Sequence, residues 1–184
     1  MPSLRPPFTI CDRLVTRERT RIQLASHAHE REFLDAVRRS RALHHPWVQP
    51  PATPDAYRDY LASHQDPRGI AFFIWLEEPR GLAGIVNVNE IVHGSFRSAY
   101  LGYYAFAPYA GRGLMKDGLA QVITRAFKEI RLHRLEANIQ PGNHRSKALV
   151  KALGFRREGL SPRYLKIGGR WRDHERWAIL SEDW

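Results

Sequence analysis

Cysteine is almost absent from this sequence, and so is any long hydrophobic run. Cys11 is the one cysteine, so the chain has no internal disulfide and no cysteine pair for a structural metal. No apolar segment approaches the roughly 18–20 residues that span a bilayer, and the N-terminal residues MPSLRPPFTI lack the hydrophobic region of a signal peptide. We therefore expect no membrane partner and a cytoplasmic location.

Lysine and acidic residues are also scarce. The chain has 5 lysines against 24 arginines, and its formal net charge is +10. The excess lies in the second part, because residues 1–109 carry 13 basic and 11 acidic side chains, whereas residues 110–184 carry 16 and 8. The electrostatic field of such an excess of positive charge attracts phosphates, nucleic acid or acidic protein surfaces. An arginine-rich solvated surface without a ligand explains the same composition.

Metal-binding patterns are missing despite nine histidines. The pairs His27/His29 and His44/His45 lack the i, i+4 spacing of a zinc site on a helix. We expect no metal.

The length of 184 residues fits one domain, 1–184, and is long enough for a sizeable hydrophobic core. The patterns predict helices at 27–43, from Pro54 onward, at 113–130 and at 144–153, and strands at 13–24, 70–77, 82–91, 98–106 and 132–139, with a hairpin at 164–180. Short turns within 70–106 indicate an antiparallel meander, and the strand–helix–strand unit at 100–139 indicates one parallel pair. The expected class is α+β, with a mostly antiparallel mixed sheet flanked by helices.

A glycine loop, PYAGRG at 108–113, joins the strand at 98–106 to the helix that follows. The first turn of a helix leaves backbone N–H groups unpaired, and its dipole is positive there. Glycines let a phosphate approach these groups closely, and Arg112 and Lys116 add positive charge. The loop matches neither GxxxxGK[ST] nor GxGxxG. It is therefore either a diphosphate cradle or a tight connection without a ligand.

The loop, the LEANI strand and the residues NHRSKALVKALGF at 143–155 together resemble the GNAT superfamily of N-acetyltransferases. The family pattern Q/R-x-x-G-x-G/A, which binds the diphosphate of acetyl-CoA, maps onto residues 110–115, with Ala110 and Met115 as departures. The resemblance implies a GNAT fold, with acetyl-CoA at the glycine loop between the fourth strand and the central helix. It implies cofactor contacts from Phe106, Gly111, Arg112, Gly113, Leu114, Met115, Asn143 and Ser146.

Three further stretches are similar to the RimJ type within this family: VNEIVHGSFRSAYLGYY, GRGLMKDGL and GGRWRDHERWAI. Enzymes of that type resemble ribosomal-protein-alanine N-acetyltransferases, which acetylate the α-amine of a protein. The resemblance therefore implies a protein N-terminus, ribosomal in particular, as the acceptor.

Acetyl transfer to an amine needs a proton acceptor for the amine and a proton donor for the departing thiolate. Glu136 is the candidate base, and its alternative is an ion pair with Arg134. Ser146 is the candidate acid or a pantetheine ligand, because Val150 stands where many family members have a catalytic tyrosine. Tyr103 and Tyr104 are alternatives for the acid, against a purely structural role in the sheet. Trp47 and Tyr103 are candidate substrate contacts, and strand-end backbone N–H groups, often at a bulge, would hold the oxyanion.

Two other functions stay open at this point. A small amine such as a polyamine or an aminoglycoside would be the acceptor of a related enzyme, but a polycation favours an acidic pocket. A non-catalytic ribosome- or RNA-binding module would use the basic charge alone, although no RNA-binding fingerprint is present. The charge would also serve an enzyme that associates with the ribosome. We expect a monomer or a homodimer.

Overall fold

The structure, a computed structural model, describes residues 20–64, 68–78 and 80–184. Within these ranges, seven strands form one sheet in the order β1-β2-β3-β4-β5-β7-β6. The strands are β1 (Thr20–Leu24), β2 (Gly69–Leu76), β3 (Gly81–Val92), β4 (Ser98–Ala105), β5 (Arg134–Ile139), β6 (Arg156–Ile167) and β7 (Arg170–Leu180). The helices are α1 (Glu30–Arg39), α2 (Arg41–His44), α3 (Pro54–Ser63), α4 (Leu114–Lys128) and α5 (His144–Ala152), with short 3₁₀ helices at His27–His29 and Ser181–Asp183.

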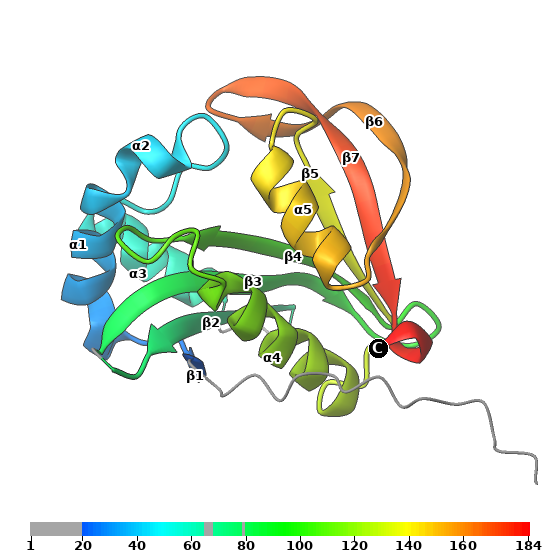
Figure 1. Cartoon of the computed structure of the whole chain (residues 1–184), viewed down its shortest axis with the longest axis horizontal. Coiled ribbons are helices and arrows are strands. Elements are labelled where there is room, and N and C mark those ends of the chain that lie inside the picture. Colours follow the sequence, from blue (N-terminus) through cyan, green and yellow to red (C-terminus); the bar gives the residue numbers. More distant parts are fainter. Residues whose placement is uncertain (1–19, 65–67, 79) are drawn as a thin grey trace, which may run out of the picture.

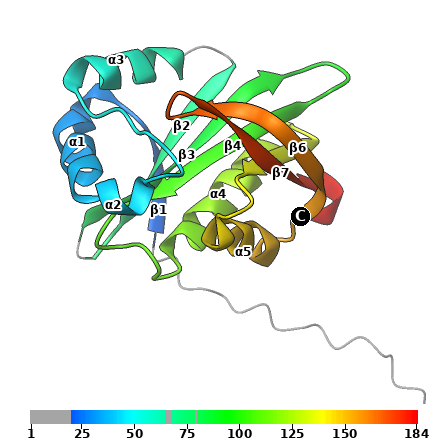
Figure 2. The same cartoon turned by 90° about the horizontal axis from the view of Figure 1, so that it is seen from above.

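Helices cover both faces of the sheet, so the expected α+β class is confirmed (Figures 1 and 2). The apolar stripe of α4 packs on one face with Val150 of α5, against alternate strand residues such as Leu101 and Leu135. On the other face Phe33 of α1 and Tyr57 of α3 pack against β2 and β3. We call these the α4 face and the α1 face.

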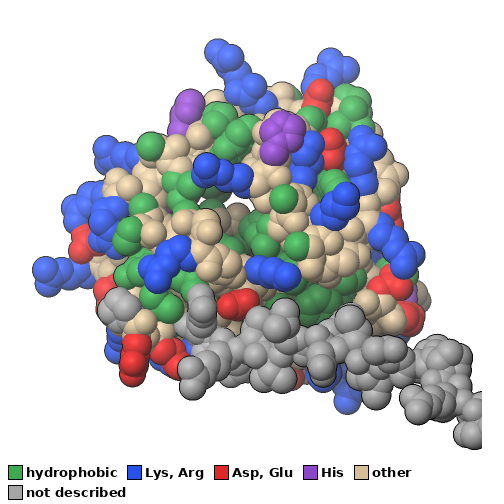
Figure 3. Space-filling model, in the orientation of Figure 1, with side chains coloured by type: hydrophobic (Ala, Val, Ile, Leu, Met, Phe, Trp, Pro, Cys, Tyr) green, Lys and Arg blue, Asp and Glu red, His purple; other side chains and the backbone are tan. Residues whose placement is uncertain are grey.

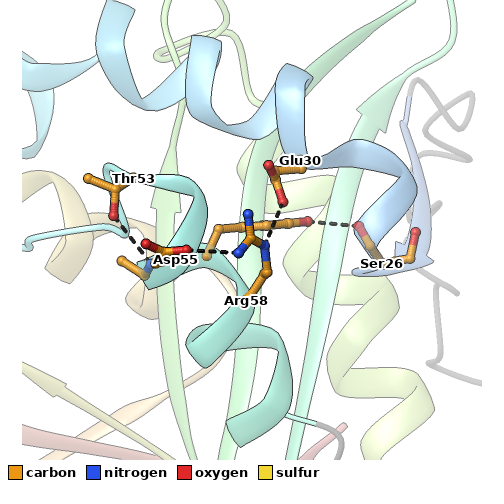
Figure 4. A network of polar contacts seen from close by, with 7 residues as sticks. Ser26, Glu30, Thr53, Asp55 and Arg58 are labelled. Carbon is orange, nitrogen blue, oxygen red and sulfur yellow. Dashed lines mark hydrogen bonds and ion pairs between the residues drawn. The ribbon is translucent and has the colours of Figure 1, made fainter.

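The helices of the α1 face are held together by a local polar network (Figure 4). Thr53 accepts a hydrogen bond of 3.2 Å from the N–H of Ala56 and so caps α3, whose first residue is the expected Pro54. Arg58 lies between Asp55, at 2.8 Å, and Glu30 of α1, at 3.7 Å. Exposed pairs of this kind each contribute less than about 1 kcal/mol.

The predicted parallel pair is β4 with β5, and it is very short. The two strands are in register only at Ser98↔Arg134, Ala99↔Leu135 and Tyr100↔Glu136. Beyond Tyr100 they diverge, as Figure 1 shows, while β4 remains paired with β3 and β5 with β7. The sheet is therefore split from this point onward, and we call the gap between the two strand ends the opening.

Three predicted elements differ from the structure. The helix expected at 27–43 is a 3₁₀ turn followed by α1 and α2, interrupted at Ser40, whose hydroxyl donates to the Ala36 carbonyl at 2.7 Å and accepts from the N–H of Ala107 at 2.9 Å. The strand expected from Leu132 begins at Arg134, after Arg131 with φ of 63°. The hairpin is longer than predicted because β6 begins at Arg156, and residues 13–19 of the first predicted strand lie outside the described part.

Candidate functional site

The glycine loop leads from the end of β4 into α4, beside the opening. Gly111 and Gly113 both have φ of 82°, a left-handed conformation that favours glycine. A β-carbon at either position would meet no described atom within 4 Å, so the backbone is exposed there. No side chain of the described residues caps α4, whose N-cap is Gly113. The first N–H groups of α4 are thus available to an anion, with Arg112 and Lys116 nearby in the chain.

Two of the expected cofactor contacts have buried side chains, and a third, Met115, is partly buried. Leu114 belongs to the core of the α4 face, and Phe106 is fully buried on the α1 face. The sulfur of Met115 lies 2.2 Å from where a β-carbon of Gly84 would be, so the absence of a side chain on β3 makes room for it. Leu114 and Met115 can therefore offer a ligand only their backbone N–H groups.

The backbone of Phe106 is already hydrogen bonded within the chain. Its N–H donates to Ala83 at 2.8 Å, and its carbonyl accepts from Tyr109 and Ala110 at 2.9 and 3.1 Å. These bonds fix the start of the glycine loop. A direct cofactor contact from Phe106 stays a prediction.

A hydrogen-bonded chain spans the opening on the α4 face. The hydroxyl of Tyr103 in β4 lies 2.7 Å from the hydroxyl of Ser146 in the first turn of α5. The side-chain oxygen of Asn143 accepts from the N–H of Ser146 at 3.1 Å, which confirms the predicted cap of α5. Burial raises the pKa of Tyr103, so its proton is retained at neutral pH.

Glu136 lies on the opposite face, because it alternates with Leu135 and Ala137 along β5. The Nε of Arg134 donates to its carboxylate at 2.8 Å, and Arg134 also pairs with Glu158 of β6. The ion pair that was the alternative for Glu136 is therefore present. Its side chain still has 19% exposure, so the carboxylate is accessible to water.

The opening carries an unpaired acceptor next to Glu136. The side-chain oxygen of Asn138, two residues further along β5, is buried and has no hydrogen-bond partner among the described residues. Tyr100 lies where the strands begin to diverge, and its hydrogen bond with Tyr164 of β6 raises its pKa to about 12. The α1 face of the opening is therefore polar, and sequence reasoning had not singled out Asn138.

Tyr104 and His44 meet at the end of β4 on the α1 face. Their rings lie 5.2 Å apart at an angle of 73°. The Nε2 of His44 lies 2.8 Å from the carbonyl oxygen of Ala105, so this nitrogen carries the proton and donates it. The Nδ1 of His44 and the hydroxyl of Tyr104 are buried without partners among the described residues. Burial lowers the pKa of His44 and raises that of Tyr104.

Trp47 lies in the loop after α2, on the far side of the opening from β4. Its carbonyl accepts from the side chain of Gln140 at 3.2 Å, and its ring lies 3.3 Å from where a β-carbon of Gly142 would be. The loop thus contacts the β5–α5 connection and encloses the opening. Figure 3 shows the surface hollowed between this loop and α5, with basic side chains at its border.

A pocket of about 580 Å³ lies between the loop after α2 and the tip of the β6–β7 hairpin, which Figure 2 shows extending toward α2. Three arginines (Arg41, Arg170 and Arg172) and two histidines (His44 and His45) contribute to its wall, and no acidic residue does. We call it the basic pocket. Sequence reasoning missed it because its two walls come from distant parts of the chain.

The pairing of β4 with β3 is regular from Tyr100 to the end of the strand. No register shift interrupts β4 between Tyr100 and Ala105; the shift lies opposite the start of β4, between Asn89 and Val92. A bulge at the strand end, expected for the oxyanion, is therefore not where it was predicted.

Within residues 20–64, 68–78 and 80–184, no group of three or more His, Cys, Asp or Glu is arranged to hold a metal. No helix in the same ranges is long and apolar enough to cross a bilayer.

Comparisons with known proteins agree with this geometry. The sequence profile of the acetyltransferase (GNAT) domain matches residues 19–156. The [ribosomal protein uS5]-alanine N-acetyltransferase of Escherichia coli (strain K12) is 39% identical over 119 residues, which is 64% of this chain and 61% of that protein. The match thus spans less than two thirds of that relative's length.

Solved structures share the fold over most of the chain. RimJ of Mycobacterium smegmatis in complex with CoA-disulfide has a TM-score of 0.81 and 27% identity, over 89% of this chain and 82% of that one. The spermidine N-acetyltransferase of Vibrio cholerae in complex with CoA and spermine has a TM-score of 0.77 and 20% identity, over 90% and 97%, which is a likeness of fold alone. Because the family profile covers well over half of the sequence, this protein belongs to the acetyltransferase (GNAT) domain family.

Proposed function

We propose that this enzyme transfers an acetyl group from acetyl-CoA to the α-amine at the N-terminus of a protein, a ribosomal protein in particular. The observation that carries the proposal is the opening, which brings the exposed N-terminus of α4 together with polar groups on both faces of the sheet. The choice of acceptor is supported by the name of the 39% identical relative from Escherichia coli.

The residues at the opening fit acetyl-CoA. The backbone N–H groups of residues 111–115 would hold the diphosphate, because both glycines expose the backbone and Arg112 and Lys116 supply charge. The side-chain amide of Asn143 is free to bond the pantetheine chain, since its cap uses only the oxygen. RimJ of Mycobacterium smegmatis, solved with CoA-disulfide, supports this assignment.

The chemistry then divides between the two faces. On the α1 face the amine nitrogen attacks the thioester carbonyl, and Glu136 takes the amine proton through water. An α-amine has a pKa near 8, so about a tenth of it is neutral at pH 7. As the C–N bond forms and the C–S bond breaks, the thiolate leaves on the α4 face. Tyr103 donates its proton there, and the hydroxyl of Ser146, 2.7 Å away, orients that donor.

A small polycationic acceptor fits less well. The basic pocket repels a polyamine, and the spermidine enzyme of Vibrio cholerae shares only 20% identity. The positive charge of residues 110–184 is instead suited to association with ribosomal RNA or the ribosome. If that association is electrostatic, its affinity falls steeply with salt.

The test is release of free CoA thiol from acetyl-CoA over a panel of acceptors. Peptides that begin with Ala, Ser or Met, each with a free or a blocked α-amine, are compared with a lysine-only peptide and with spermidine. We expect turnover only with free α-amines, and a loss of about 100-fold in kcat/KM for Glu136→Gln. Turnover of spermidine alone would move the enzyme to the small-amine class.

A further inference from the structure

We propose that the basic pocket selects acceptor proteins whose residues directly after the α-amine are acidic. This rests on the proposed function, because it assigns the part of the acceptor that follows the reacting amine. The occupant is a short, extended, carboxylate-bearing segment of the acceptor polypeptide.

The charge of the pocket is not neutralised within the part of the chain that the structure describes. Arg41 comes from α2, and Arg170 and Arg172 alternate along β7, so the latter two project from the same face of the strand. None of the three has an ion pair with a described carboxylate. Arg134 and Arg157, by contrast, pair with Glu158 and Glu175.

Unpaired guanidinium groups that converge on one cavity present a ready partner for carboxylates. The planar fork of arginine matches a carboxylate in two parallel hydrogen bonds. A lysine-rich segment or a polyamine in the same place would meet repulsion only. The volume of about 580 Å³ lies within the range of ligand sites.

The pocket adjoins the end of β4. His44 contributes to its wall and also donates to the carbonyl of Ala105, at the end of β4. The two opposite walls approach closely at Gly168 and Gln49. A β-carbon built on Gly168 would lie 3.5 Å from the Gln49 side chain. An acceptor whose α-amine reaches the opening on the α1 face can therefore place its next residues in the pocket.

A peptide fits this lining better than single-stranded RNA does. Binding of single-stranded RNA depends on aromatic side chains on which the bases stack. The lining contains no Phe, Tyr or Trp side chain, whereas it does contain Pro46, Val48, Pro50 and Ile167, which suit the apolar stem of a peptide.

The test compares three peptides that share an N-terminal alanine and a free α-amine. Positions two to six are glutamates, glutamines or lysines. Exposed ion pairs each contribute about 1.4- to 5-fold, so two or three contacts predict a preference of about 10-fold in kcat/KM for the acidic over the neutral peptide at low salt. Screening at 0.5 M salt reduces this preference to about twofold.

The double variant Arg170→Gln/Arg172→Gln should lose most of the preference, and Arg170→Lys/Arg172→Lys should retain about half of it. The matched control is Arg31→Gln/Arg39→Gln, which removes the same charge from exposed positions of α1 outside the pocket and should keep the full preference. A melting curve for each variant measures its folding. Fluorescence polarisation with the acetylated acidic peptide measures binding to the pocket without turnover.

The outcomes separate this proposal from the proposed function. Equal kcat/KM for all three peptides overturns the charge selection and leaves α-amine acetylation intact. If no free amine is acetylated, the proposed function fails. The polarisation assay then still shows whether the pocket binds acidic peptides. A preference that the control variant loses equally reflects net charge and overturns the assignment. A single-stranded oligonucleotide that displaces the acidic peptide at lower concentration assigns the pocket to RNA instead.

Discussion

The two adjacent tyrosines of β4 form a matched pair that tests which face carries the proton donor. Both side chains are partly buried, and replacement by phenylalanine removes one oxygen from each. Tyr103→Phe loses the 2.7 Å hydrogen bond to Ser146, which costs about 1 kcal/mol and about 2–4 °C in Tm for a chain of this size. Its kcat should fall about 100-fold because the thiolate loses its proton donor.

Tyr104→Phe should differ from Tyr103→Phe in its effect on both stability and kcat. The Tyr104 hydroxyl is buried without a partner among the described residues, so its removal relieves a desolvation cost and raises the free energy of unfolding by up to about 1 kcal/mol. We expect an unchanged kcat and a Tm that is equal or slightly higher. Thiol release at saturating substrates and scanning calorimetry measure both quantities.

The pH profile adds an independent check. The rising limb of kcat/KM reflects the α-amine, with a pKa near 8. Because burial raises the pKa of Tyr103, the donor keeps its proton and the plateau should not fall by pH 10 in the unmodified enzyme. A 100-fold loss in Tyr104→Phe with full activity in Tyr103→Phe would reverse the assignment of the two faces and refute the mechanism.

Three other perturbations have distinct expected outcomes. Gly113→Ala, at φ of 82°, should raise the KM for acetyl-CoA at least fivefold and cost about 1–2 kcal/mol of stability; Gly94→Ala, at φ of 72° in the β3–β4 turn, should cost the same stability with an unchanged KM. Gly118→Ala places a β-carbon 2.5–2.7 Å from three carbons of Ile74, so urea titration should show a loss of about 1–2 kcal/mol after the helix-propensity gain. Ile74→Ala is itself destabilising because Ile74 is fully buried, but Gly118→Ala should cost less when it is added to Ile74→Ala than when it is made alone. An equal cost in both backgrounds would contradict the steric cause. Burial lowers the pKa of His44, so the unfolded state binds more protons and stability falls as the pH drops below about 6.5; His44→Gln should make that fall shallower in melting curves between pH 7 and 5.

Local signals predicted the elements that carry the cofactor end of the site. Asn143 caps α5 through the N–H of Ser146, and Gly113 marks the start of α4, both as expected. These features depend on residues within three or four positions of one another, so the sequence alone contains the necessary information.

Long-range contacts explain what the sequence did not reveal. Ser40 interrupts a helical pattern because its hydroxyl binds Ala107, which lies 67 residues away in the chain. The face of Glu136 could not be chosen from alternation alone, since a strand has two faces and only its packing against α4 decides between them. The basic pocket has walls from Arg41 and Arg170, so no window of the sequence contains it.

The three-residue pairing of β4 with β5 also has a mechanical consequence. Among the strands that the structure describes, this pairing is the only one that joins the half of the sheet formed by β1 to β4 to the half formed by β5 to β7. Because the two halves are joined at one end only, their free ends can separate with little distortion, whereas a co-substrate bound between them restrains that movement. The two halves should therefore vibrate as separate bodies in the free enzyme and as one body once the co-substrate lies between them, and amide hydrogen exchange along the free edges of β4 and β5 would record that change.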